Sequence, residues 1–501
     1  MPIVAGVDTS TQSTTVELRD ATSGVLLGSG RAPHPVTHPP VSEQDPRAWW
    51  AAFEVALVEA TSAADVAPTE IRAIAVAGQC HGLVLLDDAG EPLRPAKLWN
   101  DTTSAPQAQR IVAELGGDAW ARAVGSVPIP AFTITKLAWV AEHEPALLDR
   151  ARHVLLPHDY MTWRLTGRAA TDRSEASGTG YFAAHEGRYR TDLLDQFVGR
   201  RDWLPLLPEV LGPDEVVGTV RRDVSDRLGL AADVVVSVGG GDQHLGVVGL
   251  GLGIGEVAYS LGTSGVVIAV ADAPVFDGSG VVTGVADATG GYLPLACTLN
   301  ATKVTDWTAR MLGVDVRALG DLALAADASD DRPVLAAFLD GERTPDRPDA
   351  TGVLAGITTA TTREQLARAA FEGVLLGLVA AHARIREVGA PCDGAVTVMG
   401  GGARSGAYRQ LLADLLDAPV HVRDADESTA RGAAIQAAAA LHGRRVADLA
   451  AELRPATTQT IEPRARIADV VRDRYASVAA WTGADRRARR PSPTTPKEHA
   501  P

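Results

Sequence analysis

The sequence has few cysteines, few aromatic residues and no excess of positive charge. Its 501 residues include three cysteines, Cys80, Cys297 and Cys392, which are widely spaced and form no C-x-x-C pair. This usage indicates neither a disulfide framework nor a zinc site. Acidic residues outnumber basic ones, 62 against 47, so the net charge is −15, which argues against a nucleic-acid partner. An anionic ligand would have to be held locally, by backbone N–H groups, lysines or a metal.

Long apolar runs are also absent. No stretch approaches the roughly 18 apolar residues of a membrane-spanning helix; the richest, residues 246–258, is interrupted by glycines and Glu256. Residues 1–8 lack the basic and apolar regions of a signal peptide. We therefore expect a soluble, cytoplasmic protein without a membrane partner.

The pattern of strands and turns predicts a duplicated α/β architecture. Residues 3–18 read as a strand, a polar turn and a second strand, and residues 256–270 repeat this pattern about 250 residues later. A long helix is expected over 362–388, with a capping box either from Thr362 and Gln365 or from Thr361 and Glu364. The basic, proline-rich residues 485–501 read as a disordered tail.

Both predicted hairpins have turns rich in hydroxyl groups and glycine. The first turn is Asp8-Thr9-Ser10-Thr11-Gln12-Ser13-Thr14 and the second is Ser260-Leu261-Gly262-Thr263-Ser264-Gly265. Backbone N–H groups in such turns converge on one concavity that suits phosphate. A carboxylate beside phosphate donors indicates a divalent cation between them. Alternatively, both are ordinary tight turns.

Asp242 follows three glycines at the end of an apolar strand. A carboxylate exposed there by small neighbours is placed as a catalytic base would be. The alternative is an ordinary helix N-cap, a position that Asp favours.

Two short segments predict a polar pocket for a sugar or polyol. Gln79, Cys80 and His81 stand between two glycines and two apolar strands, and the segment Leu98-Trp99-Asn100-Asp101 could add to the same pocket. Trp99 would form a wall against the sugar face and Asp101 would accept from a hydroxyl. The alternatives are that His81 is a satisfied loop histidine and that Trp99 belongs to the core.

The segment Gly400-Gly401-Gly402-Ala403-Arg404-Ser405 lies between a predicted strand and helix. Its spacing is not that of the dinucleotide motif, and no G-x-x-x-x-G-K-[ST] sequence occurs. These patterns favour a nucleotide that approaches bare backbone, and they exclude a P-loop enzyme.

Together these motifs resemble the FGGY carbohydrate kinases, and within them the xylulokinases, over residues 3–440. The resemblance rests on six segments in order: residues 78–82, 98–101, 240–242, 260–265, 341–345 and 400–405. It implies two actin-like domains (ribonuclease H-like, hexokinase/Hsp70-type) around a central cleft. Residues 1–245 would form the N-terminal domain with the sugar site and residues 246–484 the nucleotide-binding C-terminal domain.

The implied reaction is transfer of phosphate from ATP to a ketopentose, D-xylulose in the first place, in the presence of Mg²⁺. Asp242 would be the base and Asp8 would hold Mg²⁺ through water. The sugar site would contain Cys80, His81, Trp99, Asp101, Asp242 and Gln243. The nucleotide would meet Thr11, Gln12, Ser13, Gly262, Thr263, Ser264, Gly401, Gly402 and Ala403. The resemblance also implies that a homodimer is a common state.

Several departures from the family pattern leave alternatives open. Cys80 stands where xylulokinases usually have Met, Ser10 stands where Gly is usual, and the Lys or Arg expected near Thr15 is absent; Lys303 or Lys136 would have to replace it. A kinase for ribulose or for an erythritol-like or glycerol-like polyol therefore stays open. So do a non-catalytic sugar sensor and an ATP-driven switch of the actin/Hsp70 type.

Overall fold

The computed structural model describes residues 2–481 except 328 and 425–426. The predicted tail, residues 485–501, lies outside the described residues.

The first of two large sheets has the strand order β13-β14-β5-β1-β2-β3, with β15 also pairing with β5. Strands β1, β2 and β3 form an antiparallel meander, whereas β5 runs parallel to β1 and β14 runs parallel to β5. The strand bounds are β1 Ile3–Thr9, β2 Ser13–Asp20, β3 Leu26–Pro33, β5 Ile71–Gly78, β13 Val216–Thr219, β14 Val235–Ser237 and β15 Gly240–Gly241.

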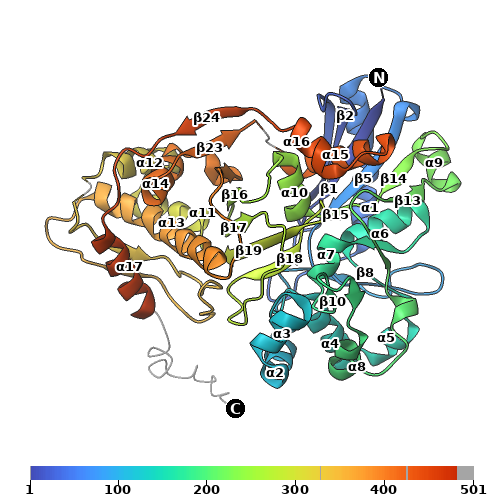
Figure 1. Cartoon of the computed structure of the whole chain (residues 1–501), viewed down its shortest axis with the longest axis horizontal. Coiled ribbons are helices and arrows are strands. Elements are labelled where there is room, and N and C mark those ends of the chain that lie inside the picture. The colour runs from blue at the N-terminus through green and yellow to red at the C-terminus, as the bar shows by residue number, and fades with distance from the viewer. Residues whose placement is uncertain (1, 328, 425–426, 482–501) are drawn as a thin grey trace, which may run out of the picture.

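The second sheet repeats this arrangement. Its order is β18-β19-β17-β16-β22-β23-β24, and β19, β17, β16, β22, β23 and β24 pair in the same senses as β3, β2, β1, β5, β14 and β13. The bounds are β16 Val257–Leu261, β17 Gly265–Ala269, β18 Thr283–Ala286, β19 Tyr292–Thr298, β22 Val396–Met399, β23 Val420–Arg423 and β24 Thr457–Ile461. The duplicated α/β architecture predicted from the two hairpins is therefore confirmed (Figure 1).

Helices cover both sheets. Those of the N-terminal half are α1 Pro46–Ala64, α2 Ala105–Leu115, α3 Gly117–Val124, α4 Thr133–His143, α5 Pro145–Arg150, α6 Pro157–Thr166, α7 Arg173–Ser177, α8 Thr191–Phe197, α9 Arg222–Leu228 and α10 Asp242–Leu250. Those of the C-terminal half are α11 Thr302–Leu312, α12 Val316–Ala325, α13 Arg363–Glu387, α14 Gly406–Leu416, α15 Ser428–His442, α16 Val446–Glu452 and α17 Asp469–Trp481. The remaining strands form small sheets: β4 Glu43–Gln44 with β7 Ala96–Lys97, β6 Val84–Leu86 with β8 His153–Leu155, β9 Ala170–Asp172 with β12 Glu209–Leu211, β10 Phe182–Ala183 with β11 Arg188–Tyr189, and β20 Val334–Ala336 with β21 Val353–Ala355.

Helix α13 alone among the described helices is long and apolar enough to cross a membrane, but most of its apolar stretch is buried. It packs against α11, α12, α14 and β19 in the core of the second half. Its N-cap is the predicted one: the Thr362 hydroxyl accepts from the Gln365 N–H at 3.3 Å, and the Gln365 side chain accepts from the Thr362 N–H at 3.2 Å.

Helix α15, from late in the chain, packs on the first sheet rather than on the second. It contacts β1, β5 and α10, and in Figure 1 it lies beside β1 and α10, away from α13 and α14. A Cβ atom on Gly432 of α15 would lie 1.8 Å from the carbonyl oxygen of Leu245 in α10, and one on Gly6 of β1 would lie 2.0 Å from the carbonyl of Ala430. The backbones meet directly at these glycines. The domain boundary between residues 245 and 246 stays a prediction. The contact of α15 with β1 joins residues from the two sides of this boundary.

Gly432→Ala should destabilise the protein by about 1–3 kcal/mol, because the added methyl group forces α10 and α15 apart in a close-packed region. The free energy of unfolding from urea titration measures the loss. A matched control is Gly218→Ala in β13, where the methyl group meets open space and the change should stay within about 0.5 kcal/mol. Equal values for the two variants would contradict the close contact.

Candidate active site

Asp8 lies near the end of β1, at the entry to the first hairpin turn. Its side chain is buried, and Oδ1 accepts a hydrogen bond from the Ser10 hydroxyl at 2.7 Å. Burial, together with the nearby negative charge of Asp242, raises the pKa of Asp8 to about 7. Two carboxyl groups thus share one desolvated region, an arrangement that a divalent cation stabilises.

Asp242 is the first residue of α10. Gly241 occupies the N-cap position, and no side chain caps the helix there, so Asp242 is not the ordinary N-cap that the alternative interpretation required. Its Oδ1 accepts from the Gln243 N–H at 2.7 Å and from the Cys80 thiol at 3.3 Å. Within the described part of the chain, no recorded hydrogen bond reaches Oδ2. Burial raises the pKa of Asp242.

A cavity of about 250 Å³ lies between the two halves of the chain. Cys80, His81, Trp99, Asp242 and Gln243 line it from the N-terminal half, and the facing wall comes from the second half: Ser264, Thr283, Cys297, Thr298 and Arg343. Five of the six residues predicted for the sugar site therefore surround one cavity, which we call the sugar cavity after that prediction. Asp242 faces the same space as His81, as the predicted mechanism requires.

The lining of this cavity carries buried polar atoms without hydrogen-bond partners: His81 Nδ1, Gln243 Oε1 and His244 Nε2. Burial lowers the pKa of His81 to about 3 and that of His244 to about 4, so both rings are neutral. A neutral imidazole offers one donor and one acceptor. Because buried polar groups are normally paired, the cavity suits a ligand with several hydroxyl groups.

Trp99 joins the sugar cavity to the first hairpin turn. Its indole N–H donates to the Thr11 hydroxyl at 2.8 Å, and Thr11 donates in turn to Gln79 Oε1 at 3.3 Å. Thr11, predicted to contact the nucleotide, lines the sugar cavity together with Trp99. Gln12 and Ser13 were also predicted to contact the nucleotide. Gln12 is exposed and Ser13 is buried, and neither lines this cavity or a larger one in the C-terminal half.

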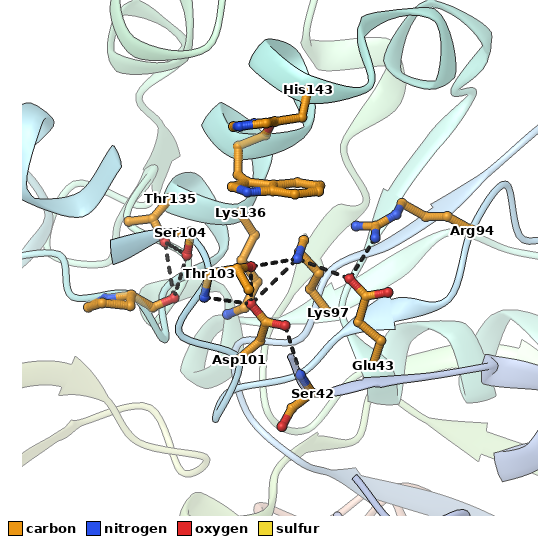
Figure 2. Close-up of polar contacts among 12 residues, drawn as sticks. Ser42, Glu43, Arg94, Lys97, Asp101, Thr103, Ser104, Thr135, Lys136 and His143 are labelled. Atoms are coloured by element: carbon orange, nitrogen blue, oxygen red, sulfur yellow. Dashed lines mark hydrogen bonds and ion pairs between the residues drawn. The ribbon is translucent and has the colours of Figure 1, made fainter. Parts of the chain in front are cut away.

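Asp101 does not line this cavity. Figure 2 shows its carboxylate among Ser42, Thr103 and Lys97. Its side chain is fully buried, with Oδ2 accepting from the Ser42 N–H at 2.9 Å and Oδ1 from the Thr103 N–H at 3.0 Å. Lys97 Nζ is a further donor to Oδ1 at 3.4 Å. Since protein groups occupy both oxygens, the structure contradicts the expectation that Asp101 accepts from a sugar hydroxyl.

A larger cavity of about 780 Å³ lies in the C-terminal half. Four predicted nucleotide-binding residues line it: Gly262, Thr263, Gly401 and Gly402. A Cβ atom on Gly401 would meet nothing within 4 Å, so its backbone is open to a ligand, whereas one on Gly402 would lie 2.8 Å from the Leu261 Cβ. Ala403 is buried and lies outside the lining.

The turn between β16 and β17 separates the two cavities. Gly262 and Thr263 line the larger cavity, and Ser264 lines the smaller. The turn is fixed by α11, because the N–H groups of Ala301 and Thr302 donate to the Thr263 and Gly262 carbonyls at 3.1 and 3.0 Å. A group bound in the larger cavity can thus reach the smaller one at this turn.

Arg343 and Cys297 line the sugar cavity but were not among the predicted site residues. Glu342 fixes the Arg343 loop, accepting from the Leu299 N–H at 2.5 Å, from the Asn300 side chain at 2.9 Å and from the Arg343 N–H at 2.7 Å. The sequence signal for Arg343 was the segment 341–345, which is one of the six segments that resemble the family. No role was predicted for its arginine. Nothing in the sequence around Cys297 distinguishes it.

The basic side chain expected near Thr15 is absent from the residues next to it in the sequence, but Arg31 lies beside Thr15 on the neighbouring strand. Arg31 on β3 pairs directly with Thr15 on β2, and its Nε donates to the Ser13 hydroxyl at 3.0 Å. The two lysines considered as replacements are engaged elsewhere: Lys136 donates to buried backbone carbonyls, and Lys303 lies 3.2 Å from Asp340.

Comparisons with known proteins show a family match over most of the chain. Residues 3–249 match the N-terminal domain, and residues 257–441 the C-terminal domain, of the FGGY family of carbohydrate kinases. The chain belongs to this family. It is 44% identical to the xylulose kinase of Streptomyces coelicolor over 90% of each chain, and 44% identical to that of Streptomyces rubiginosus over 95% of this chain and 96% of the other. A crystal structure of the xylulose kinase from Bifidobacterium adolescentis superposes with a TM-score of 0.82 at 37% identity, covering 95% of this kinase and 99% of that chain.

Arg31→Gln should raise the KM of the kinase for ATP roughly fivefold, because an exposed charge contact is worth about 1 kcal/mol. Steady-state kinetics at low and high salt measure this, and the difference should shrink as salt screens the charge. Arg47→Gln is the control, since Arg47 has a similarly exposed side chain that pairs with Asp45. An unchanged KM for ATP would show that Arg31 does not replace the missing cation.

Proposed function

We propose that this carbohydrate kinase transfers the terminal phosphoryl group of ATP to a hydroxyl of xylulose, with Asp242 as the general base. The observation that carries the proposal is the position of Asp242, which faces the sugar cavity beside the turn that this cavity shares with the larger one. The names of the most similar relatives and of the superposed structure supply the sugar.

The larger cavity would hold the nucleotide and the smaller one the sugar. Asp242 Oδ2 would accept the proton of the attacking hydroxyl, while Cys80 and the Gln243 N–H fix the carboxylate through Oδ1. His81 and Gln243 would pair with other hydroxyls of the sugar. Phosphoryl transfer needs little covalent chemistry from the protein, so these residues act mainly by positioning and by electrostatics.

The Asp8 region fits a magnesium ion. Mg²⁺ is usually held by one or two carboxylates together with water and substrate phosphates, and among the described residues no group of three or more His, Cys, Asp or Glu forms a complete protein site. Asp8 would hold Mg²⁺ through water. When bound, the ion would neutralise charge on the phosphates beside the first hairpin turn.

The preferred sugar would be set partly by Cys80, which contacts the base and lines the cavity. A thiol leaves more room than the methionine usual in xylulokinases, so ribulose and small polyols belong in any substrate test. We also propose that the protein is cytoplasmic and forms a homodimer. Light scattering on the purified protein tests the oligomeric state.

A coupled assay for ADP release over a panel of pentuloses and polyols, with ATP and Mg²⁺, tests the function. Xylulose should give the highest kcat/KM. A sugar sensor or an ATP-driven switch would show no turnover stimulated by sugar, and that result would overturn the proposal.

Asp242→Asn should lower kcat for xylulose by roughly 10²- to 10⁴-fold, as expected for loss of a general base. Affinity for ATP should be retained, which calorimetry measures. Asp88→Asn, in an exposed turn, serves as a control with normal turnover. Near-normal turnover by Asp242→Asn would remove Asp242 from the role.

A further inference from the structure

His81 has an unusual backbone for a residue that lines the sugar cavity. Its φ is +65°, and the only other non-glycine residues with positive φ in the described part of the chain are Asp65 and Asp417. Those two are the C-caps of α1 and α14, where the left-handed conformation is common. His81 has no such explanation, and a conformation of this kind persists only where the surrounding structure enforces it.

The peptide groups of His81 are held on both sides by buried side chains. The His81 N–H donates to Glu175 Oε1 at 3.0 Å, and the His81 carbonyl accepts from Lys136 Nζ at 3.0 Å and from the Thr133 hydroxyl at 3.2 Å. Glu175, Lys136 and Thr133 are each 0% exposed. They come from α7 and α4, so two separate segments fix one residue.

Burial of the Lys136 ammonium group is energetically unfavourable, because the charge is removed from water. Burial lowers the pKa of its ammonium group to about 7, and the negative charge of Asp101 opposes this shift. Besides the His81 carbonyl, Lys136 donates to the carbonyl of Ala131, whose side chain lines the same cavity. Figure 2 shows Lys136 beside Asp101, on the side of the cluster away from Arg94 and Glu43. The carboxylate of Asp101 thus favours the charged form of Lys136.

The fixed backbone determines where the imidazole of His81 points. The ring packs on Phe132, which also lines the cavity, with 4.9 Å between the ring centroids. A Cβ atom on Gly178 would lie 2.4 Å from the His81 ring, so the glycine next to α7 leaves room for it. A relaxed φ at residue 81 would turn the ring away from this position.

We propose that Lys136 and Glu175 are positioning residues, which hold the His81 peptide groups in the left-handed conformation and thereby aim the imidazole into the sugar cavity. The inference rests on the proposed function, because it assumes that the sugar binds where His81 lies. Neither side chain lines the cavity, so both act through His81.

Lys136→Met tests this directly. The substitution keeps the length and apolar stem of the side chain and removes the donor to the His81 carbonyl. We expect kcat/KM for xylulose to fall roughly 10- to 100-fold, as for a misplaced binding group, mainly through KM. Binding of ATP, measured by calorimetry, should not change, because the larger cavity is formed by other segments.

Lys97→Met is the matched control. Lys97 is an equally buried lysine of the same cluster, 1% exposed, and pairs with Glu43 at 3.0 Å and with Asp101, without a recorded contact to His81. We expect it to lower the melting temperature but to leave the KM for xylulose unchanged. A rise in KM equal to that of Lys136→Met would show that the cluster acts only through stability, and would overturn the inference.

Glu175 supplies a second pair of variants, which applies even where Lys136→Met does not fold. Glu175→Gln keeps a carbonyl oxygen that accepts from the His81 N–H, so it should retain the wild-type KM for xylulose. Glu175→Leu removes the acceptor and should raise that KM. Equal kinetics in the two variants would contradict the role of Glu175.

A double-mutant cycle with His81→Gly shows whether Lys136 acts through His81. Glycine adopts positive φ without strain but has no ring to aim, so Lys136→Met should add little to the defect of His81→Gly. Fully additive losses would overturn the inference. The wild-type assay separates the two proposals, since absent turnover of xylulose contradicts the function, whereas normal xylulose kinetics in Lys136→Met contradict only the positioning role.

Discussion

The contact of α15 with α10 and β1 is the constraint on which the active site depends. Gly6, Gly249 and Gly432 let these backbones touch, since a Cβ atom on each would lie about 2 Å from a facing carbonyl oxygen: 2.0, 1.9 and 1.8 Å. In this position α15 forms hydrogen bonds to the loop that precedes Asp242. Gln436 accepts from the Gly239 N–H at 3.0 Å and donates to the Gly239 carbonyl at 3.0 Å. Helix α15 thus fixes the loop that precedes Asp242.

Local patterns were sufficient to predict most of the fold. The helix expected over residues 362–388 forms as α13, Arg363–Glu387, and both hairpins form where their turn residues stand. These features depend on neighbours within a few residues, which sequence displays. The position of α15 on the first sheet depends on contacts between distant segments, and the alanine-rich sequence of this helix gives no sign of which sheet it meets.

The site was predictable to a similar degree. Cys80, His81, Asp242 and Gln243 were found because they belong to short polar segments next to glycines at the ends of apolar strands, and Trp99 because it is a large aromatic residue next to polar ones. Asp101 follows Trp99 by two residues, but its carboxylate accepts from the Ser42 and Thr103 N–H groups and does not line the cavity. Arg343 and Cys297 reach the cavity from the second half, so only the association of the two halves brings them to the sugar site.

Desolvation connects the chemistry of the site with its architecture. The cavity between the halves neutralises His81 and His244 and raises the pKa of Asp8 and Asp242. Each of these shifts has burial as its largest cause. A hydroxyl-rich ligand can pair with the neutral rings without bringing a charge into this environment. Several hydroxyl groups on one ligand would supply partners for the polar atoms of the lining that have none in the protein, His81 Nδ1, Gln243 Oε1 and His244 Nε2.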